Sequence, residues 1–149
     1  MIAVVIADYI RQMGYSARAH HVLNSNMPIA PSLISAGMGE MCRMQLVLHP
    51  KFGARAKMAV ITTNLPLAPD TPIDFGAQDF CRTCKQCARQ CPAQAIPMDT
   101  EQIAFNGYLH WRIDVGRCAN YRNRHGGVCG HCVEVCPQSN KPTNRFEYI

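Results

Sequence analysis

Cysteine is the residue type that points most directly to chemistry in this sequence. The chain has 149 residues and 9 cysteines, and eight of them lie in two groups near the C-terminal end. Their spacing is Cys81-x-x-Cys84-x-x-Cys87-x-x-x-Cys91-Pro92, then Cys118, then Cys129-x-x-Cys132-x-x-x-Cys136-Pro137. Thiolates at this spacing bind the irons of [4Fe–4S] clusters, which accept and donate single electrons. The two groups together predict a pair of clusters, and therefore an electron relay.

The assignment of ligands follows from the two-cluster ferredoxin motif, in which the fourth cysteine of one group binds the other cluster. The second group lacks the first cysteine of the motif, and Cys118 takes its place. The motif predicts one cluster held by Cys81, Cys84, Cys87 and Cys136, and another held by Cys91, Cys118, Cys129 and Cys132. Zinc is the alternative, because paired Cys-x-x-Cys spacings also form tetrahedral sites. A zinc ribbon has no use for a third cysteine at the next x-x position, so the spacing favours clusters.

Composition and charge exclude several other classes of protein. The formal net charge is +5, and 17% of the residues are charged. Two clusters that carry about −2 each with their thiolates would bring this charge near +1. Lys and Arg do not cluster with aromatic residues, so we expect no nucleic-acid partner. No apolar run reaches the roughly 18 residues of a membrane span, and no signal peptide is visible, which predicts a cytoplasmic protein and argues against secreted disulfides.

We expect a domain boundary near residue 75, with the cysteine-rich part after it. Before this point we expect a helix over 3–14, a strand within 16–24 and a helix within 26–36, from their apolar spacing and glycine or proline boundaries. The runs 45–48 and 57–64 are typical of strands and predict a hairpin or two adjacent strands. Residues 65–76 contain three prolines and predict a linker without regular structure. The ninth cysteine, Cys42, stands apart, and we expect a buried, unreactive thiol.

Outside the cysteines, the sequence resembles the corrinoid-dependent reductive dehalogenases. The resemblance rests on GMGEMCRMQLVLHPKFGARAKMAVITTNLPLAPDTPIDFG, residues 37–76, followed directly by the eight-cysteine module. TTNLPLAPDTPIDFG, residues 62–76, is its most specific part. Members of this family are much longer than this chain, often begin with an export signal, and carry an N-terminal half that closes the corrinoid pocket. The resemblance therefore indicates a C-terminal part of such a protein, which would be exported and membrane-associated if the chain is truncated.

The resemblance implies an α+β fold. Residues 1–75 would form a partial nitroreductase-like α/β core that binds the corrinoid, and residues 76–149 a ferredoxin-like domain with two [4Fe–4S] clusters. The implied activity is removal of halide from a small organohalide, with electrons from a donor passing through the clusters to a cobalamin-type corrinoid. The missing N-terminal half or a membrane-anchor subunit would be a further partner. A tyrosine paired with a basic residue supplies the proton in this family, and Arg55 or Lys57 could be that basic residue.

The turn between the helix predicted within 26–36 and the run 45–48 is where we expect the corrinoid contacts. The candidates are Ser35, Gly37, Gly39, Glu40 and Arg43. Glycines allow the backbone to approach a macrocycle, and a loop of free N–H groups suits the phosphate of a nucleotide tail. A plain helix-to-strand turn with Glu40 and Arg43 as a surface pair is the alternative.

Three functions remain open at this point. The first is a reductive dehalogenase or its C-terminal part, with the related epoxyqueuosine reductases as a variant that shares corrinoid and clusters. The second is a stand-alone ferredoxin-like electron carrier without corrinoid. The third is a zinc-stabilised interaction module. Cobalt and iron content separate the three.

Overall fold

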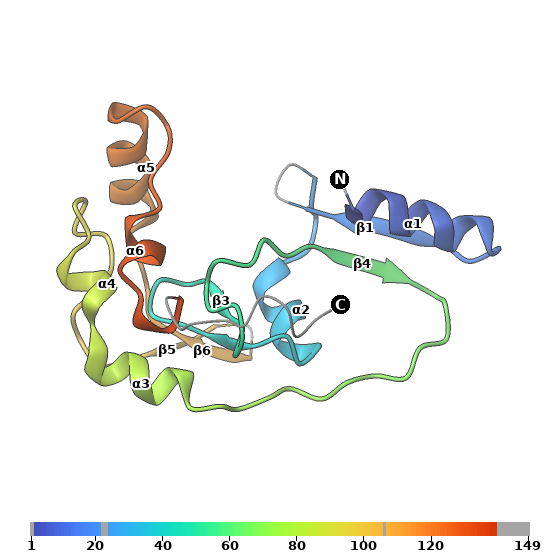
Figure 1. Cartoon of the computed structure of the whole chain (residues 1–149), viewed down its shortest axis with the longest axis horizontal. Helices are drawn as coiled ribbons and strands as arrows, with labels where there is room; N and C mark the ends of the chain where they lie inside the picture. Colours follow the sequence, from blue (N-terminus) through green and yellow to red (C-terminus); the bar gives the residue numbers. More distant parts are fainter. Residues whose placement is uncertain (1, 22–23, 106, 140–149) are drawn as a thin grey trace. The chain divides into compact units, whose positions relative to one another are not determined.

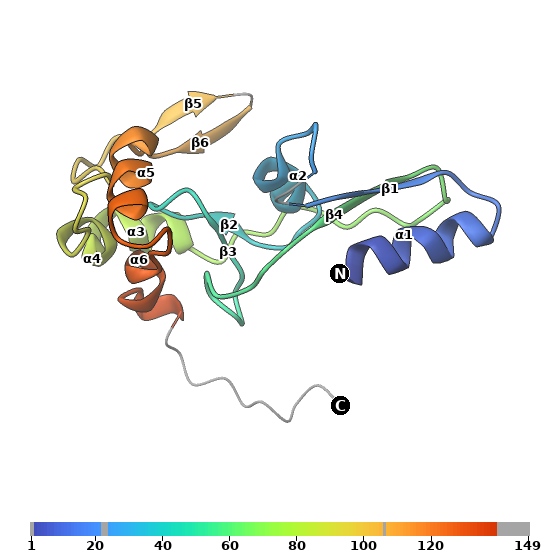
Figure 2. The same ribbon diagram turned by 90° about the horizontal axis from the view of Figure 1, so that it is seen from above.

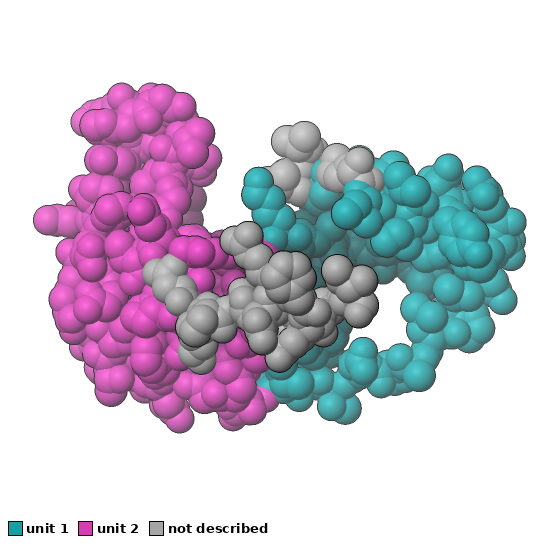
Figure 3. All heavy atoms as spheres, in the orientation of Figure 1, with its two compact units in different colours: residues 1–38, 57–73 teal, residues 39–56, 74–149 magenta. Residues whose placement is uncertain are grey.

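The computed structural model describes residues 2–21, 24–105 and 107–139. Two compact units emerge from its contacts, and the chain passes between them more than once. Unit 1 consists of residues 1–38 and 57–73, and unit 2 of residues 39–56 and 74–149 (Figure 3). The boundary expected near residue 75 falls at residues 73–74. The prediction of an unbroken first domain is wrong, however, because residues 39–56 pack with the cysteine-rich unit.

Unit 1 is a two-stranded antiparallel sheet with a helix along it (Figures 1 and 2). Its elements are α1 (Ile2–Gln12), β1 (Ala17–His20), α2 (Ile29–Ser35) and β4 (Val60–Thr63). Helix α1 buries Ala3, Ala7 and Ile10, which recur at the four- and three-residue spacing of one helix face. Gly14 follows this helix with a φ of 90°, a conformation that ends a helix readily only at glycine.

Unit 2 is built from short elements. They are β2 (Glu40–Met41), β3 (Val47–Leu48), α3 (Ala77–Cys84), α4 (Gln86–Arg89), β5 (Ile103–Phe105), β6 (Tyr108–His110), α5 (Val115–Arg124), α6 (His131–Glu134) and the 3-10 turn η1 (Pro137–Ser139). Strands β2 and β3 pair with each other, as do β5 and β6. Among the described residues, no helix is long and apolar enough to cross a bilayer.

Cysteine side chains form part of the core of unit 2. Two of the predicted ligands, Cys87 and Cys136, are buried together with Cys42, Met44 and Leu48. Small residues complete most of this cluster, so the buried apolar area is modest. Domains of this kind gain stability when a bound metal group ties their ligands together.

The pairing of strands differs from the prediction at one place. The runs 45–48 and 57–64 do contain strands, but β3 pairs with β2 and β4 pairs with β1. The predicted hairpin between them is therefore wrong. Helices α1 and α2, strand β1 and the irregular linker over 65–76 are confirmed. The mixed α and β content is confirmed as well.

Candidate functional site: two cysteine-lined cavities

One cavity of unit 2 is lined by the first predicted set of thiols. The predicted ligands among its lining residues are Cys81, Cys84, Cys87 and Cys136. The cavity and its opening to solvent together contain about 280 Å³ of empty space. The fold thus brings Cys136, from the second sequence group, to three cysteines of the first group.

Two short helices and a sharp joint place these thiols. Cys81 and Cys84 lie three residues apart on α3, and therefore on the same helix face. Lys85 joins α3 to α4 in the left-handed conformation, with a φ of 54°, and the chain reverses there before Cys87. Helix α4 contacts α6, which brings Cys136, two residues beyond the end of α6, to the same cavity. The first three thiols therefore lie on helices.

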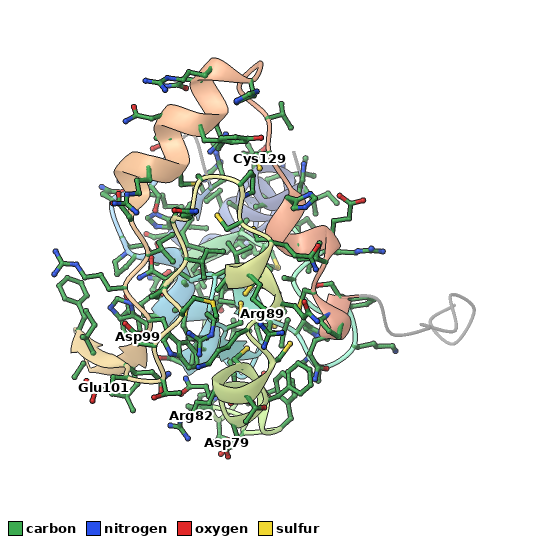
Figure 4. The ribbon with its side chains drawn as sticks, turned by 90° about the vertical axis from the view of Figure 1, so that its left-hand side faces the viewer. Asp79, Arg82, Arg89, Asp99, Glu101 and Cys129 are labelled. Carbon is green, nitrogen blue, oxygen red and sulfur yellow. The ribbon has the colours of Figure 1, made fainter. Side chains whose placement is uncertain are left out.

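The second cavity is lined by the second predicted set. Its cysteines are Cys91, Cys118, Cys129 and Cys132, around about 500 Å³ of space. Cys118 lies on α5, whose first turn is capped by Asp114: the carboxylate Oδ1 accepts a hydrogen bond from Arg117 N at 2.9 Å. Cys129 lies in the segment between α5 and α6 (Figure 4). Cys91 Sγ accepts a hydrogen bond from Ala95 N at 3.4 Å, as sulfur ligands of clusters commonly do.

Met44 lines both cavities, so one thioether side chain stands between the two sets of thiols. This residue belongs to the turn between β2 and β3 and is buried. A buried apolar side chain at this place excludes water from the space between the two sets of thiols. Nothing in the sequence singled out Met44.

Burial keeps several of these thiols protonated when no metal is bound. Loss of solvation raises the pKa of Cys87 to about 12, and neighbouring thiols reinforce this effect. Burial also raises the pKa of Cys81 and of Cys132. Because iron binds the thiolate form, cluster assembly at these residues must release protons.

The chemistry of the donors fits iron–sulfur clusters. The second cavity presents its four predicted thiols, and the first presents its own four together with Cys42. The described residues that line them include no carboxylate, and soft thiolates select iron–sulfur clusters or zinc. Within the described ranges, no three His, Cys, Asp or Glu side chains are grouped tightly enough to hold a single metal ion. A four-iron cluster is larger than one ion and needs ligands spread around a cavity.

Cys42 is confirmed as a buried thiol, with none of its surface exposed. Burial raises its pKa far above the ordinary value of a thiol. The structure adds that Cys42 lines the first cavity, a position that its isolation in the sequence did not indicate.

The candidate corrinoid contacts are split between the two units. Ser35 and Gly37 lie in unit 1, whereas Gly39, Glu40 and Arg43 lie in unit 2. The side chains of Glu40 and Arg43 are buried, so their alternative description as a surface pair is wrong.

Glu40 and Arg43 have partners within unit 2. Glu40 Oε2 accepts hydrogen bonds from Phe75 N at 2.8 Å and Ala77 N at 3.0 Å. Arg43 is fully buried and lines the first cavity. These contacts give both side chains a role in building the cysteine-rich unit, and their contact with a corrinoid stays a prediction.

The two glycines are explained by the packing of the chain itself. A Cβ atom at Gly37 would lie 2.6 Å from the carbonyl oxygen of Thr71, and one at Gly39 would lie 2.2 Å from that of Leu48. Both distances are shorter than any real contact, so only glycine fits. A close approach of a macrocycle is therefore not needed to explain either residue.

The candidate basic residues Arg55 and Lys57 are both exposed, Arg55 in unit 2 and Lys57 in unit 1. Their catalytic role stays a prediction.

The thiol sets define unit 2 as an iron–sulfur protein of the two-cluster type. A family model described as "4Fe-4S dicluster domain" matches residues 80–140. Beyond this module, the chain is 39% identical over 144 residues to the tetrachloroethene reductive dehalogenase of Sulfurospirillum multivorans. That alignment covers 92% of this chain and 28% of the relative.

Solved structures agree with the sequence comparison. A catabolic reductive dehalogenase matches with a TM-score of 0.87 at 43% identity, covering 94% of this chain and 20% of that protein. An epoxyqueuosine reductase matches with a TM-score of 0.66 at 18% identity, covering 92% of this chain and 36% of that protein. The latter shows likeness of fold alone. Over nearly its whole length the chain is similar to reductive dehalogenases, and it spans about a quarter of the length of the curated relatives that it matches.

Proposed function

We propose that this chain is the electron-delivering part of a reductive dehalogenase. The observation that carries the proposal is the sorting of eight cysteines into two cavities of four, each set drawn from both sequence groups. The first cluster would be held by Cys81, Cys84, Cys87 and Cys136. The second would be held by Cys91, Cys118, Cys129 and Cys132. Electrons from a donor would enter one cluster and leave from the other, past Met44.

The proposed reaction replaces the halogen of a small organohalide by hydrogen. Two electrons and one proton are consumed, and a halide ion leaves. The corrinoid, when bound, supplies the cobalt chemistry that breaks the carbon–halogen bond. This part of the proposal is supported by the 39–40% identity to tetrachloroethene reductive dehalogenases and by a solved relative whose title names B12-dependent dehalogenation.

We also propose that unit 1 is part of a nitroreductase-like α/β core that forms one side of the corrinoid site. The support is the 43% identity over nearly the whole chain, which includes unit 1. Among the candidate contacts, Ser35 remains exposed at the end of α2, and Gly37 follows it. The backbone of this segment is therefore where we place a contact with the corrinoid, while Glu40 and Arg43 serve the iron–sulfur unit.

The test is an anaerobic absorbance spectrum with iron and cobalt counted on the same sample after reconstitution with cobalamin. About eight irons and one cobalt per chain are expected. About eight irons without cobalt would refute the corrinoid site and leave a ferredoxin-like electron carrier. A colourless protein that holds zinc would refute the clusters as well.

A further inference from the structure

Arg43 is a buried cation beside the first cavity. Its side chain has none of its surface exposed, and it lines the cavity together with Cys81 and four other thiols. Arginine keeps its charge in any protein environment, so a full positive charge sits there. A buried charge without compensation is costly, and the structure must therefore supply partners.

The partners of Arg43 are neutral. Its Nε donates to the carbonyl oxygen of Cys81 at 3.0 Å, and its Nη1 donates to those of Pro97 at 2.8 Å and Asp99 at 2.6 Å. The guanidinium also lies over the ring of Trp111, 4.6 Å from its centre. The contacts described for Arg43 include no carboxylate, and Nη2 is buried without a hydrogen-bond partner. These contacts orient the guanidinium without cancelling its charge.

The two cavities differ in the positively charged residues that line them. Of the described residues around the second cavity, none is Lys or Arg. The first cavity has Arg43 and also Lys85, but Lys85 is partly exposed, so solvent and salt screen its charge. Among the described residues that line the two cavities, a buried positive charge thus lies beside the first set of thiols only.

Reduction of a four-thiolate cluster adds one negative charge to a group that is already an anion. A positive charge nearby stabilises the reduced form more than the oxidised form, which raises the reduction potential. We propose that Arg43 is a positioning residue that raises the reduction potential of the first cluster while holding the Cys81 segment of α3 in place. This proposal rests on the cluster assignment made above.

The test compares three variants by redox titration of the reduced clusters, followed by electron paramagnetic resonance. Arg43→Gln removes the charge, and Arg43→Lys keeps the charge but loses the planar fork. Arg82→Gln is the matched control, because Arg82 follows Cys81 directly on α3 but is exposed and paired with Asp79 (Figure 4). Iron is counted first in every sample.

In a sample of Arg43→Gln that keeps both clusters, the ratio of reduced to oxidised form of one cluster should fall at least about tenfold at a fixed potential. This corresponds to a reduction potential lower by about 59 mV for a one-electron couple. The reduction potential of the other cluster should not change. Arg43→Lys and Arg82→Gln should each change the ratio less than about threefold. The change should be small in Arg43→Lys because lysine retains the charge, and small in Arg82→Gln because solvent already screens the charge of Arg82.

The proposal is overturned if Arg43→Gln keeps both clusters with unchanged potentials, or if Arg43→Lys shifts one potential as far as the tenfold limit. If Arg43→Gln loses about half of its iron, the Arg43→Lys variant decides between the two roles of Arg43. Lysine keeps the positive charge, so an effect of charge alone leaves the reduction potentials of Arg43→Lys unchanged. A wild-type protein that binds no iron would refute the cluster assignment itself, which is a separate outcome.

Discussion

Glu40 offers a prediction whose size can be worked out from the structure. Its carboxylate, on β2, accepts the backbone N–H groups of Phe75 and Ala77 at the start of α3, where the N-cap residue Gly76 has no side chain to do so. Helix α3 carries Cys81 and is thus capped by a residue far away in the sequence. Acidic groups at a helix N-terminus also interact favourably with the helix dipole.

Two substitutions separate charge from hydrogen bonding. Glu40→Gln keeps an acceptor oxygen but loses the charge, and it should lower the free energy of unfolding by about 1 kcal/mol. Glu40→Ala leaves two N–H groups without a partner in a largely buried place, which should cost about 3 kcal/mol. Because α3 holds two ligands of the first cluster, iron should also leave that cluster sooner in the alanine variant.

The assay is denaturant unfolding under anaerobic conditions, together with the rate of iron release to a chelator. Asp74→Asn is the control, since the exposed Asp74 Oδ1 accepts Gly76 N at 2.9 Å in the same turn. Water can replace that contact, and the cost should stay below about 1 kcal/mol. An alanine variant of Glu40 that is no less stable than Asp74→Asn, with unchanged iron release, would refute this account of α3.

Four further predictions concern single residues. Cys118→Ala should remove about half of the iron, whereas Cys42→Ala should leave the iron count unchanged, as measured on the reconstituted proteins. Gly39→Ala should destabilise unit 2 by about 3 kcal/mol or more, because its Cβ would meet a carbonyl oxygen at 2.2 Å. Gly14→Ala, with no atom within 4 Å of its Cβ but a φ of 90°, should cost about 1 kcal/mol in the same denaturant unfolding assay. Burial, aided by a nearby lysine, lowers the pKa of His49 below its ordinary 6.5, so the folded state disfavours its protonation. Its contribution to stability is therefore complete above about pH 6.5 and declines below it. His49→Asn should flatten the stability profile in that range.

The cysteine sets were predictable from the sequence because ligand spacing is a local property. Cys91 and Cys136 each precede a proline at a fixed distance from their neighbours, and the crossing of fourth ligands is part of the same motif. The helices over 2–12 and 29–35 were predictable for a similar reason, since apolar spacing and proline or glycine boundaries are local signals.

The roles of residues 39–56 could not be predicted in this way. Their position in the sequence suggested a part of the first domain, but the partners of Glu40 and Arg43 lie 35 to 56 residues further along the chain. Which strand pairs with β3 is likewise decided by the fold, because two short β-rich runs give no information about their partners. Glycines that seemed suited to a cofactor turned out to be required by the backbone next to them.

Trp111 gives this molecule a built-in optical probe. It is the only tryptophan of the sequence, it is fully buried, and Arg43 separates its ring from the first cavity. Iron–sulfur clusters absorb in the range where tryptophan emits, so a cluster assembled there should quench the fluorescence of this ring by energy transfer. Stopped-flow fluorescence would then follow filling of the first cavity in real time, without any label, and emission would return when that cluster is lost.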